Sequence, residues 1–225
     1  VRLAAATSGV PFAATEYPAA MEVEAHPTPP GGVPALPIRT TVTPDYFRAL
    51  AIPLLRGRAF SDADRGGAPA VAIVDASAAK AFWPHEDAVG QRIRYVWEKS
   101  WFTVVGVVGD VRRDSLSGAP QPSIYLPMSQ SFAQEMVLVV RADADADVTN
   151  ISRALRHAVA EANPSVPVGD LRALDGFVAA SAAGPRFAAT LLPIFSSIAL
   201  LLGAPRRYGG TTAAVSSRHT SMRCA

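Results

Sequence analysis

The run WFTVVGVV at residues 101–108 is the most strand-like stretch of the chain. Its β-branched and aromatic residues fit a buried strand. The segment QRIRYV at 91–96 predicts a second strand, and the polar residues Glu98, Lys99 and Ser100 between the two predict a hairpin. The centre of the fold is therefore expected to be a β-sheet.

Further strands are predicted on both sides of this hairpin. A segment rich in Pro and Ala spans residues 11–37, and its middle, which contains Pro27, Pro29 and Gly31, excludes regular structure. A polar loop is expected at 110–122. The remaining strands are expected at residues 1–6, 36–42, 70–74, 124–127 and 136–141, with an extended segment at 166–168.

Four helices are predicted between these strands. Thr43 is expected to cap the first helix, with Pro44 at its first helical position and Pro53 at its end. Two others are expected at 76–83 and at about 174–183. The longest helix is expected at about 147–162, where the apolar face comprises Val148, Ile151, Leu155 and Val159.

The order of these elements predicts an α+β fold. A strand–helix unit at 36–50 and a strand–helix–strand unit at 136–168 enclose a strand-rich insert. This pattern indicates a domain that is interrupted by a second, mostly β lobe. We therefore expect one lobe at residues 1–58 and 132–186, and an inserted lobe at 59–131.

An apolar segment near the end of the chain predicts a transmembrane helix. Residues 187–204 read FAATLLPIFSSIALLLGA and carry no charge, and this length suffices to cross a bilayer core. A buried core helix is the alternative, because Pro193, Ser196 and Ser197 weaken the hydropathy.

Charges on either side of this segment predict its orientation. Four arginines follow it and no acidic residue follows Asp175, whereas the arginines before it are mixed with acidic residues. Because cationic flanks stay in the cytoplasm, residues 205–225 are expected to form a disordered cytoplasmic tail, and the main domain to lie in the periplasm at the inner membrane. The sole cysteine, Cys224, falls in this tail, so no disulfide is predicted.

The composition is that of an ordinary globular protein. The 225 residues are 49% hydrophobic and 18% charged, and the net charge of +2 owes much to the C-terminal arginines. Because no basic stripe is interleaved with aromatic residues, nucleic acid is not an expected partner. The chain begins with Val1 and carries no export signal, from which we expect a fragment of a longer protein.

Several segments, taken in order, resemble one known family. They are VTPDYF (42–47), IPLLRGRAF (52–60), VAIV (71–74), VGQRI (89–93), TVVGVVGDV (103–111) and IYLP (124–127). The series resembles the MacB-like periplasmic core domain of ABC-type permeases with an FtsX-like membrane domain, in the form encoded in acidobacterial genomes. The resemblance extends over about residues 1–204, and Arg186-Phe187 matches the entry into that family's second transmembrane helix.

The resemblance implies a two-lobed extracytoplasmic domain. A porter-like lobe of βαβ units would be split by an inserted β-rich lobe, called the sabre. A single continuous sheet in which residues 59–131 form no lobe of their own would argue against the resemblance. In the family, four transmembrane helices and a separate cytoplasmic ATPase accompany a permease that acts as a dimer. Macrolide-exporting relatives convey ATP-driven motions to periplasmic partners, whereas others export lipoproteins or signal, so the substrate does not follow from the fold.

The chain departs from this family pattern at both ends. The family's first transmembrane helix and the opening strand and helix of the porter-like lobe are not present before Val1. After Ala204 the remaining membrane helices do not follow, which predicts a truncated or frameshifted gene.

None of the motifs that carry chemistry is complete. The segment Gly106-Val-Val-Gly109 is neither a dinucleotide fingerprint nor a P-loop, so its glycines are expected to bend a central strand. The segment Asp143-Ala-Asp-Ala-Asp147 begins like a calcium loop but lacks the glycine and the bidentate glutamate of that loop. Helix capping by Asp145 or Asp147 is therefore the expected role.

The other reactive side chains are scattered. The four histidines, His26, His85, His157 and His219, show no metal-site spacing. The Arg56-Gly-Arg58 turn is expected either to hold an interface between the lobes through charge-assisted hydrogen bonds or to be solvated. We predict no catalytic, cofactor-binding or metal-binding residue.

Three functions are open at this point. The leading one is a non-catalytic extracytoplasmic domain of an ABC-type permease, which transmits ATP-driven conformational change to a periplasmic substrate or partner. The alternative is a membrane-anchored ligand-binding or sensor module, which a deep apolar pocket would favour over a shallow groove. An enzyme is least expected, because the required constellations are missing from the sequence.

Overall fold

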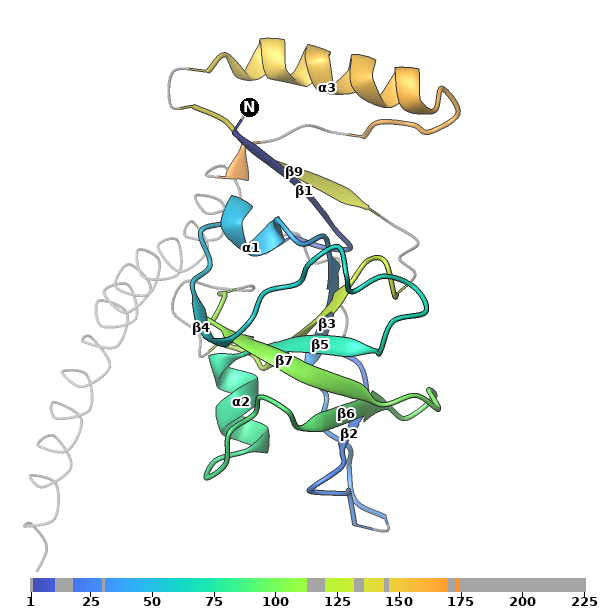
Figure 1. Cartoon of the computed structure of the whole chain (residues 1–225). Coiled ribbons are helices and arrows are strands. Elements are labelled where there is room, and N and C mark those ends of the chain that lie inside the picture. The colour runs from blue at the N-terminus through green and yellow to red at the C-terminus, as the bar shows by residue number, and fades with distance from the viewer. Residues whose placement is uncertain are drawn as a thin grey trace, which may run out of the picture. The chain divides into compact units, whose positions relative to one another are not determined.

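The computed structural model of this chain describes residues 2–10, 18–29, 31–112, 120–131, 136–143, 146–169 and 173–174. All of them belong to one compact unit, Val1–Val178, and a second unit comprises Ala179–Ala225. Figure 1 shows that a twisted sheet is the main element of the described unit.

Within the described residues, nine strands form one sheet in the order β2-β6-β7-β5-β8-β3-β1-β9, and β4 pairs with β7 beside this path. The helices are α1 (Tyr46–Ala49), α2 (Ala76–Phe82) and α3 (Val148–Ala162). The strands are β1 (Leu3–Thr7), β2 (Met21–Val23), β3 (Ile38–Val42), β4 (Leu54–Gly57), β5 (Val71–Asp75), β6 (Arg92–Tyr95), β7 (Phe102–Val108), β8 (Ser123–Pro127) and β9 (Val137–Arg141).

The hairpin at the centre of the sequence prediction is confirmed. Strands β6 and β7 are antiparallel, with Ile93 opposite Phe102. Strand β7 then pairs in parallel with β5 along its length. The strands predicted at 1–6, 36–42, 70–74, 124–127 and 136–141 are also present, each within two residues of its expected ends.

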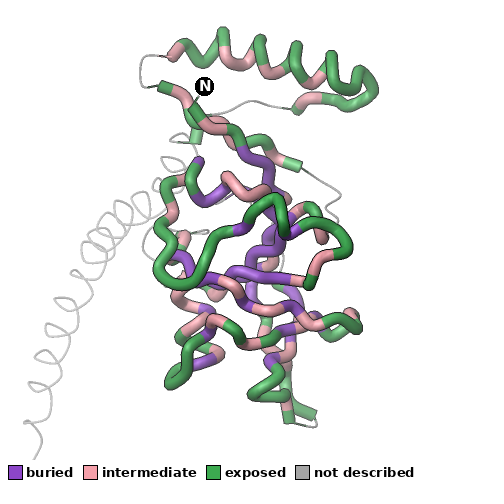
Figure 2. Tube along the Cα trace, in the orientation of Figure 1, coloured by how far each residue is buried: buried purple, intermediate pink, exposed green. Residues whose placement is uncertain are grey.

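The strand β5 contributes side chains to two hydrophobic cores. Ala72 and Val74 lie in one core together with Trp83, whereas Val71 and Ile73 lie in the other, which contains the aromatic residues of α1. Because alternate residues of a strand point to opposite faces, the two cores lie on the two faces of the sheet. All five residues of β5 are accordingly buried, and Figure 2 shows buried residues concentrated along the central strands.

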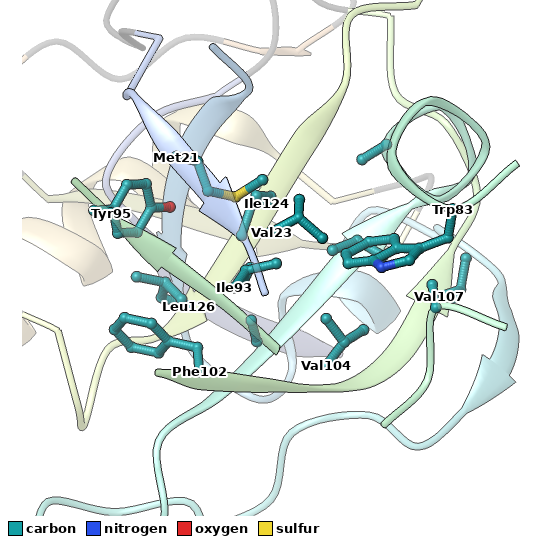
Figure 3. Close-up of a cluster of buried hydrophobic side chains, with 14 of the residues drawn as sticks. Met21, Val23, Trp83, Ile93, Tyr95, Phe102, Val104, Val107, Ile124 and Leu126 are labelled. Atoms are coloured by element: carbon teal, nitrogen blue, oxygen red, sulfur yellow. The ribbon is translucent and has the colours of Figure 1, made fainter. Parts of the chain in front are cut away.

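Figure 3 shows the first of these cores. Trp83, Val104 and Val107 lie at one end of the cluster, and Tyr95, Phe102 and Leu126 lie at the other. The side chains come from β2, β5, β6, β7 and β8 and from α2 with the residues that follow it. Burial of large apolar side chains from segments so far apart in sequence holds the sheet together.

The predicted N-cap of the first helix is wrong. The helix α1 is a single turn whose N-cap is Asp45, and Asp45 makes no side-chain capping bond. The Thr43 Oγ1 atom instead accepts a hydrogen bond of 2.9 Å from the backbone N–H of Ala6 in β1. Thr43 is used in this way because a buried amide such as that of Ala6 requires an acceptor.

Two short strands, β2 and β4, are not predicted by the sequence pattern. Strand β2 lies in the Pro- and Ala-rich segment and pairs with β6, and β4 includes two residues of the expected Arg56-Gly-Arg58 turn and pairs with β7. Each strand has only three or four residues. Such strands are defined by the partner strand more than by their own residue types, so local patterning misses them.

The extended segment expected at 166–168 is not a strand. The Ser165 amide donates to Asn163 Oδ1 at 3.0 Å, and the Val166 amide donates to the Asn163 carbonyl at 3.2 Å. Asn side chains compete for backbone amides in this way and form turns. The chain therefore bends at Val166.

The helix α3 confirms the longest predicted helix. The Asp147 carboxylate caps it by accepting from the Thr149 amide at 2.8 Å. None of its residues is buried: Val148 is exposed, and Ile151, Leu155 and Val159 are half-buried. Its apolar face therefore contributes to neither of the two cores.

The sheet is continuous across the boundaries expected for an inserted lobe. Strand β8 pairs in parallel with β3 from Ile38 to Val42, although β8 lies within residues 59–131 and β3 does not. Strands β2 and β4, from residues 1–58, likewise pair with β6 and β7.

None of the helices in the described part of the chain is long and apolar enough to span a membrane. The transmembrane helix predicted at 187–204 and the tail at 205–225 lie outside the described residues. The same holds for most of the helix predicted at about 174–183.

Candidate interaction surfaces

Three hollows on the surface of the described residues are open grooves. One of about 340 Å³ lies between α2 and β4. A second of about 340 Å³ lies between residues 66–70 and the β6–β7 hairpin, and a third of about 320 Å³ lies beside β2. Each groove is lined by a mixture of apolar and polar or charged side chains.

The groove between α2 and β4 has a buried tryptophan in its wall. Trp83 is 2% exposed, and its indole Nε1 has no hydrogen-bond partner among the described residues. Positively and negatively charged side chains also line this groove, including Arg56 and Asp87, whose Nη1 and Oδ1 atoms are 3.7 Å apart. Such a mixed lining does not select a ligand of one charge, and it fits a wet contact surface better than a ligand pocket.

An ion pair fixes the segment that follows β4. Arg58 donates from Nη1 and Nη2 to the two carboxylate oxygens of Asp64, at 2.7 and 2.8 Å. The hydrogen bonds from Arg58 hold the pKa of the Asp64 carboxyl below its usual value. Asp64 is 5% exposed, and Arg58 makes charge-assisted hydrogen bonds to it. An interface between the lobes, the role expected for such bonds at this turn, stays a prediction.

A second buried carboxylate joins three elements. Asp75 ends β5 and is fully buried, and its Oδ1 atom accepts from the Ala78 amide of α2 at 2.8 Å and from the Ser123 amide of β8 at 3.1 Å. Burial raises the pKa of this carboxyl to about 6, despite the opposing effect of these two bonds. Asp75 therefore caps α2 and also ties that helix to β8.

The glycines of residues 106–109 were predicted to bend a central strand, and at Gly106 the structure shows a close approach of two backbones. A Cβ atom on Gly106 would lie 2.3 Å from the Arg58 carbonyl oxygen, and one on Gly57 would lie 2.2 Å from the Val105 carbonyl oxygen. Gly57 also has a φ of +70°. These two glycines thus allow the backbones of β4 and β7 to approach each other.

The side chains that sequence analysis tested as metal ligands lie apart. Within the described residues, no three His, Cys, Asp or Glu side chains form a group that could hold a metal ion. His26 lies 3.9 Å from Glu86, and His157 lies 3.5 Å from Glu161 on the surface of α3. Asp143 pairs with Arg2 at the end of β9, while Asp145 and His219 lie outside the described residues.

The β6–β7 hairpin carries a surface that the sequence analysis missed. Arg94 lies 4.7 Å above the Trp101 ring and Arg92 lies 5.9 Å from it. Arg94 also pairs with Glu22 of β2, and Arg92 pairs with Glu24, which follows β2. Trp97, 57% exposed, stacks on the buried Tyr95 ring with 5.2 Å between centroids. The sequence signal that could have indicated this surface is two arginines at 92 and 94 followed by aromatic residues at 95, 97 and 101, which is too short to form the basic stripe considered in the sequence analysis.

These features define the class of the protein: a mixed α/β domain, dominated by its sheet, with open grooves and a hairpin that carries stacked aromatic rings. The model of the MacB-like periplasmic core domain family matches residues 9–158, two thirds of the chain. The chain therefore belongs to the MacB-like periplasmic core domain family, the periplasmic domains of MacB- and FtsX-like ABC transporter permeases.

Solved structures with the same fold agree with this family. The periplasmic region of MacB from Actinobacillus actinomycetemcomitans has 18% identity and a TM-score of 0.51, over 72% of this chain and 67% of that one. The extracellular domain of the noncanonic ABC-type transporter YknZ from Gram-positive bacteria has 14% identity and a TM-score of 0.50, over 74% of this chain and 78% of that one. Among curated proteins, no sequence matches significantly.

The family also bears on the continuous sheet. A continuous sheet was expected to argue against the resemblance only if residues 59–131 formed no lobe of their own. The sheet is continuous, because β8 pairs with β5 on one side and β3 on the other, and the family model still matches the chain. The lobe boundaries at residues 59 and 131 are not tested by this pairing and stay a prediction.

Proposed function

We propose that this chain is a non-catalytic extracytoplasmic domain that transmits ATP-driven conformational change from an ABC-type permease to a periplasmic substrate or partner. The single observation that carries the proposal is the family match over residues 9–158. The open, mixed grooves support transmission over ligand capture, because a sensor of small molecules needs a largely enclosed pocket.

The proposal includes an arrangement at the membrane. Residues 1–58 and 132–186 form a porter-like lobe, residues 59–131 form a sabre-like lobe, and residues 187–204 cross the inner membrane as one helix. The main domain is then periplasmic and residues 205–225 are cytoplasmic. The permease acts as a dimer with a separate cytoplasmic ATPase, and a periplasmic protein is the further partner.

The transmission hypothesis is tested by a distance between two copies of the domain. A spin label on Asp62→Cys, in a Cys224→Ser background, lies on an exposed residue in the loop that follows β4. In membranes that contain the permease and its ATPase, we expect the label–label distance distribution to differ between the nucleotide-free and ATP-trapped states. An ATPase variant that cannot hydrolyse ATP serves as the control for turnover.

Identical distance distributions in all nucleotide states would refute transmission. A change produced by a small periplasmic solute in the absence of ATP would instead support the ligand-binding alternative. The two outcomes separate the hypotheses, because only transmission requires the ATPase.

The membrane arrangement has a direct test in the sole cysteine. In intact spheroplasts, a membrane-impermeant maleimide is expected to label the Asp62→Cys variant in its Cys224→Ser background. In the wild-type protein, Cys224 is expected to stay unlabelled until the cells are lysed. Labelling of Cys224 in intact spheroplasts would place the tail outside and contradict the orientation that the arginines predict.

A further inference from the structure

The sheet narrows to one residue pair between β1 and β3. Strand β1 pairs with β9 over five residues, from Leu3 to Thr7, and β3 pairs with β8 over five residues, from Ile38 to Val42. Between β1 and β3, only Thr7 and Val42 are paired. The ribbon of β1 and β9, side by side in Figure 1, therefore joins the remaining sheet through its narrowest ladder.

Hydroxyl groups complete this short ladder at both ends. Backbone bonds of 2.9 and 2.8 Å run from the Thr43 amide to the Ala6 carbonyl and from the Ser8 amide to the Thr41 carbonyl. In a regular antiparallel ladder, the reciprocal amides would donate to the opposite carbonyls. Here the Ala6 amide donates to Thr43 Oγ1 and the Thr41 amide to Ser8 Oγ, both at 2.9 Å.

The carbonyl of Thr43 has another partner. It accepts a bond of 3.1 Å from the Tyr46 amide at the start of α1. The main chain therefore leaves the ladder at Thr43, and the side chain supplies the acceptor that the main chain no longer offers. A side-chain hydroxyl can exchange its partner for water more readily than a backbone ladder can, because no neighbouring ladder bond fixes it.

The short helix α1 lies on the ribbon side of this junction. It packs against β1 and β9, and the Arg141 guanidinium of β9 donates to the Arg48 carbonyl of α1 at 3.2 Å. Its side chains also share a buried core with the remaining sheet: Tyr46, Phe47 and Ala49 pack with residues of β5, β7 and β8. In this core the Phe47 and Tyr125 rings meet edge to face with centroids 5.0 Å apart. Apolar burial is non-directional compared with hydrogen bonds, so it does not by itself fix the position of α1.

We propose that β1, β9 and α1 form one unit that opens and shifts against the remaining sheet at the Thr7–Val42 pair, with Thr43 and Ser8 as its latch residues. The use of this joint rests on the proposed function, in which a movement inside the domain is what the domain transmits. The existence of the joint does not depend on that function. Thr43 is a positioning residue in this scheme: it acts by holding Ala6, and it touches no ligand.

Native-state hydrogen exchange of the full chain tests the joint. We expect the amides of β1, β9 and α1 to exchange together, at least about tenfold faster than those of β5, β7 and β8, as a separate cooperative unit does. Thr43→Val removes the hydroxyl and keeps the shape, and should accelerate exchange in this unit by a further factor of about ten, the effect expected from one hydrogen bond. Exchange in β5, β7 and β8 should change by less than about twofold.

Matched variants separate the latch from general destabilisation. Thr43→Ser keeps the hydroxyl and should restore the slower exchange, and Ser8→Ala should act like Thr43→Val from the other end of the ladder. Thr103→Val removes a hydroxyl from β7, outside the unit, and should leave the exchange of β1 and β9 unchanged.

Equal protection of β1, β9, β5 and β7 in the wild-type chain would overturn the proposal. Equal acceleration of all four strands by Thr43→Val would overturn it as well. If Thr43→Val fails to fold, the wild-type comparison and Ser8→Ala decide. Hydrogen exchange needs neither ATP nor a substrate, so it tests the joint independently of the proposed function. If exchange confirms the joint but the spin-label distances do not change with ATP, the proposed function is refuted and the joint is not.

Discussion

Replacement of Asp75 by asparagine should change how the stability of this domain depends on pH. The Asp75 carboxyl is fully buried at the junction of β5, α2 and β8. Its pKa in the folded state is raised from 3.8 to about 6, first by burial and then, against the opposing backbone bonds, by the nearby charge of Asp110. Asparagine keeps the capping oxygen and removes the charge.

The sign and size of the effect follow from proton binding. Between pH 4 and 6 the folded state holds a proton that the unfolded state has lost, so the free energy of unfolding falls as pH rises through this window. A shift of about two pKa units corresponds to about 3 kcal/mol. The wild type should therefore lose about 2 kcal/mol of this relative to Asp75→Asn between about pH 4 and pH 7.

Urea unfolding at several pH values measures this difference. Tryptophan fluorescence reports the transition, since Trp83 lies in the first core, and the difference between the two free energies cancels the contribution of all other titrating groups. Asp62→Asn, which removes an exposed charge from the same unit, controls for the change in net charge. A difference between wild type and Asp75→Asn that stays constant from pH 4 to 7 would refute the argument from burial.

Three further changes follow from the same structure. Asp64→Asn should lower the free energy of unfolding by about 2 kcal/mol at neutral pH, because it weakens two charge-assisted bonds from Arg58. Since the pKa of Asp64 is lowered in the folded state, this loss should become smaller as pH falls below about 4. Urea unfolding at acidic pH measures the change. Phe47→Ala should cost about 3–5 kcal/mol in the same assay, because Phe47 is 4% exposed and touches the rings of Tyr46, Phe60 and Tyr125. Gly106→Ala places a methyl group 2.3 Å from the Arg58 carbonyl and should detach β4 at a cost of about 1–3 kcal/mol, with faster amide exchange in β4 but little change in β9.

The sequence analysis was most reliable where local chemistry is decisive. The β6–β7 hairpin and the cap of α3 by Asp147 both depend on residues close together in sequence. The same local reasoning failed at Thr43, whose hydroxyl is bound by the amide of Ala6, 37 residues away. The Thr43 hydroxyl oxygen could accept a bond either from a helix amide, as a cap, or from an amide of a neighbouring strand, and the position of β1 determines which of the two forms.

The interaction surfaces were less accessible to sequence analysis than the fold. The Arg58–Asp64 pair joins residues only six apart, yet the sequence analysis did not name Asp64 as the partner of this turn. The stacking of Trp97 on Tyr95 and of Arg94 on Trp101 depends on the register of the hairpin, which residue types alone do not specify. Each groove forms between elements that are distant in sequence, such as α2 and β4, and local sequence patterns do not predict which elements lie next to each other.

The sequence by itself determined a mixed fold of helices and a dominant sheet, most of the strands and the family, because periodicity, turn residues and an ordered series of motifs are properties of the chain. The tertiary structure alone decided that β2 and β4 are strands, that the sheet runs without a break through β8, and that the β1–β3 ladder has only one residue pair. These features arise from pairings between distant segments, whose energy depends on a partner that the local sequence does not contain.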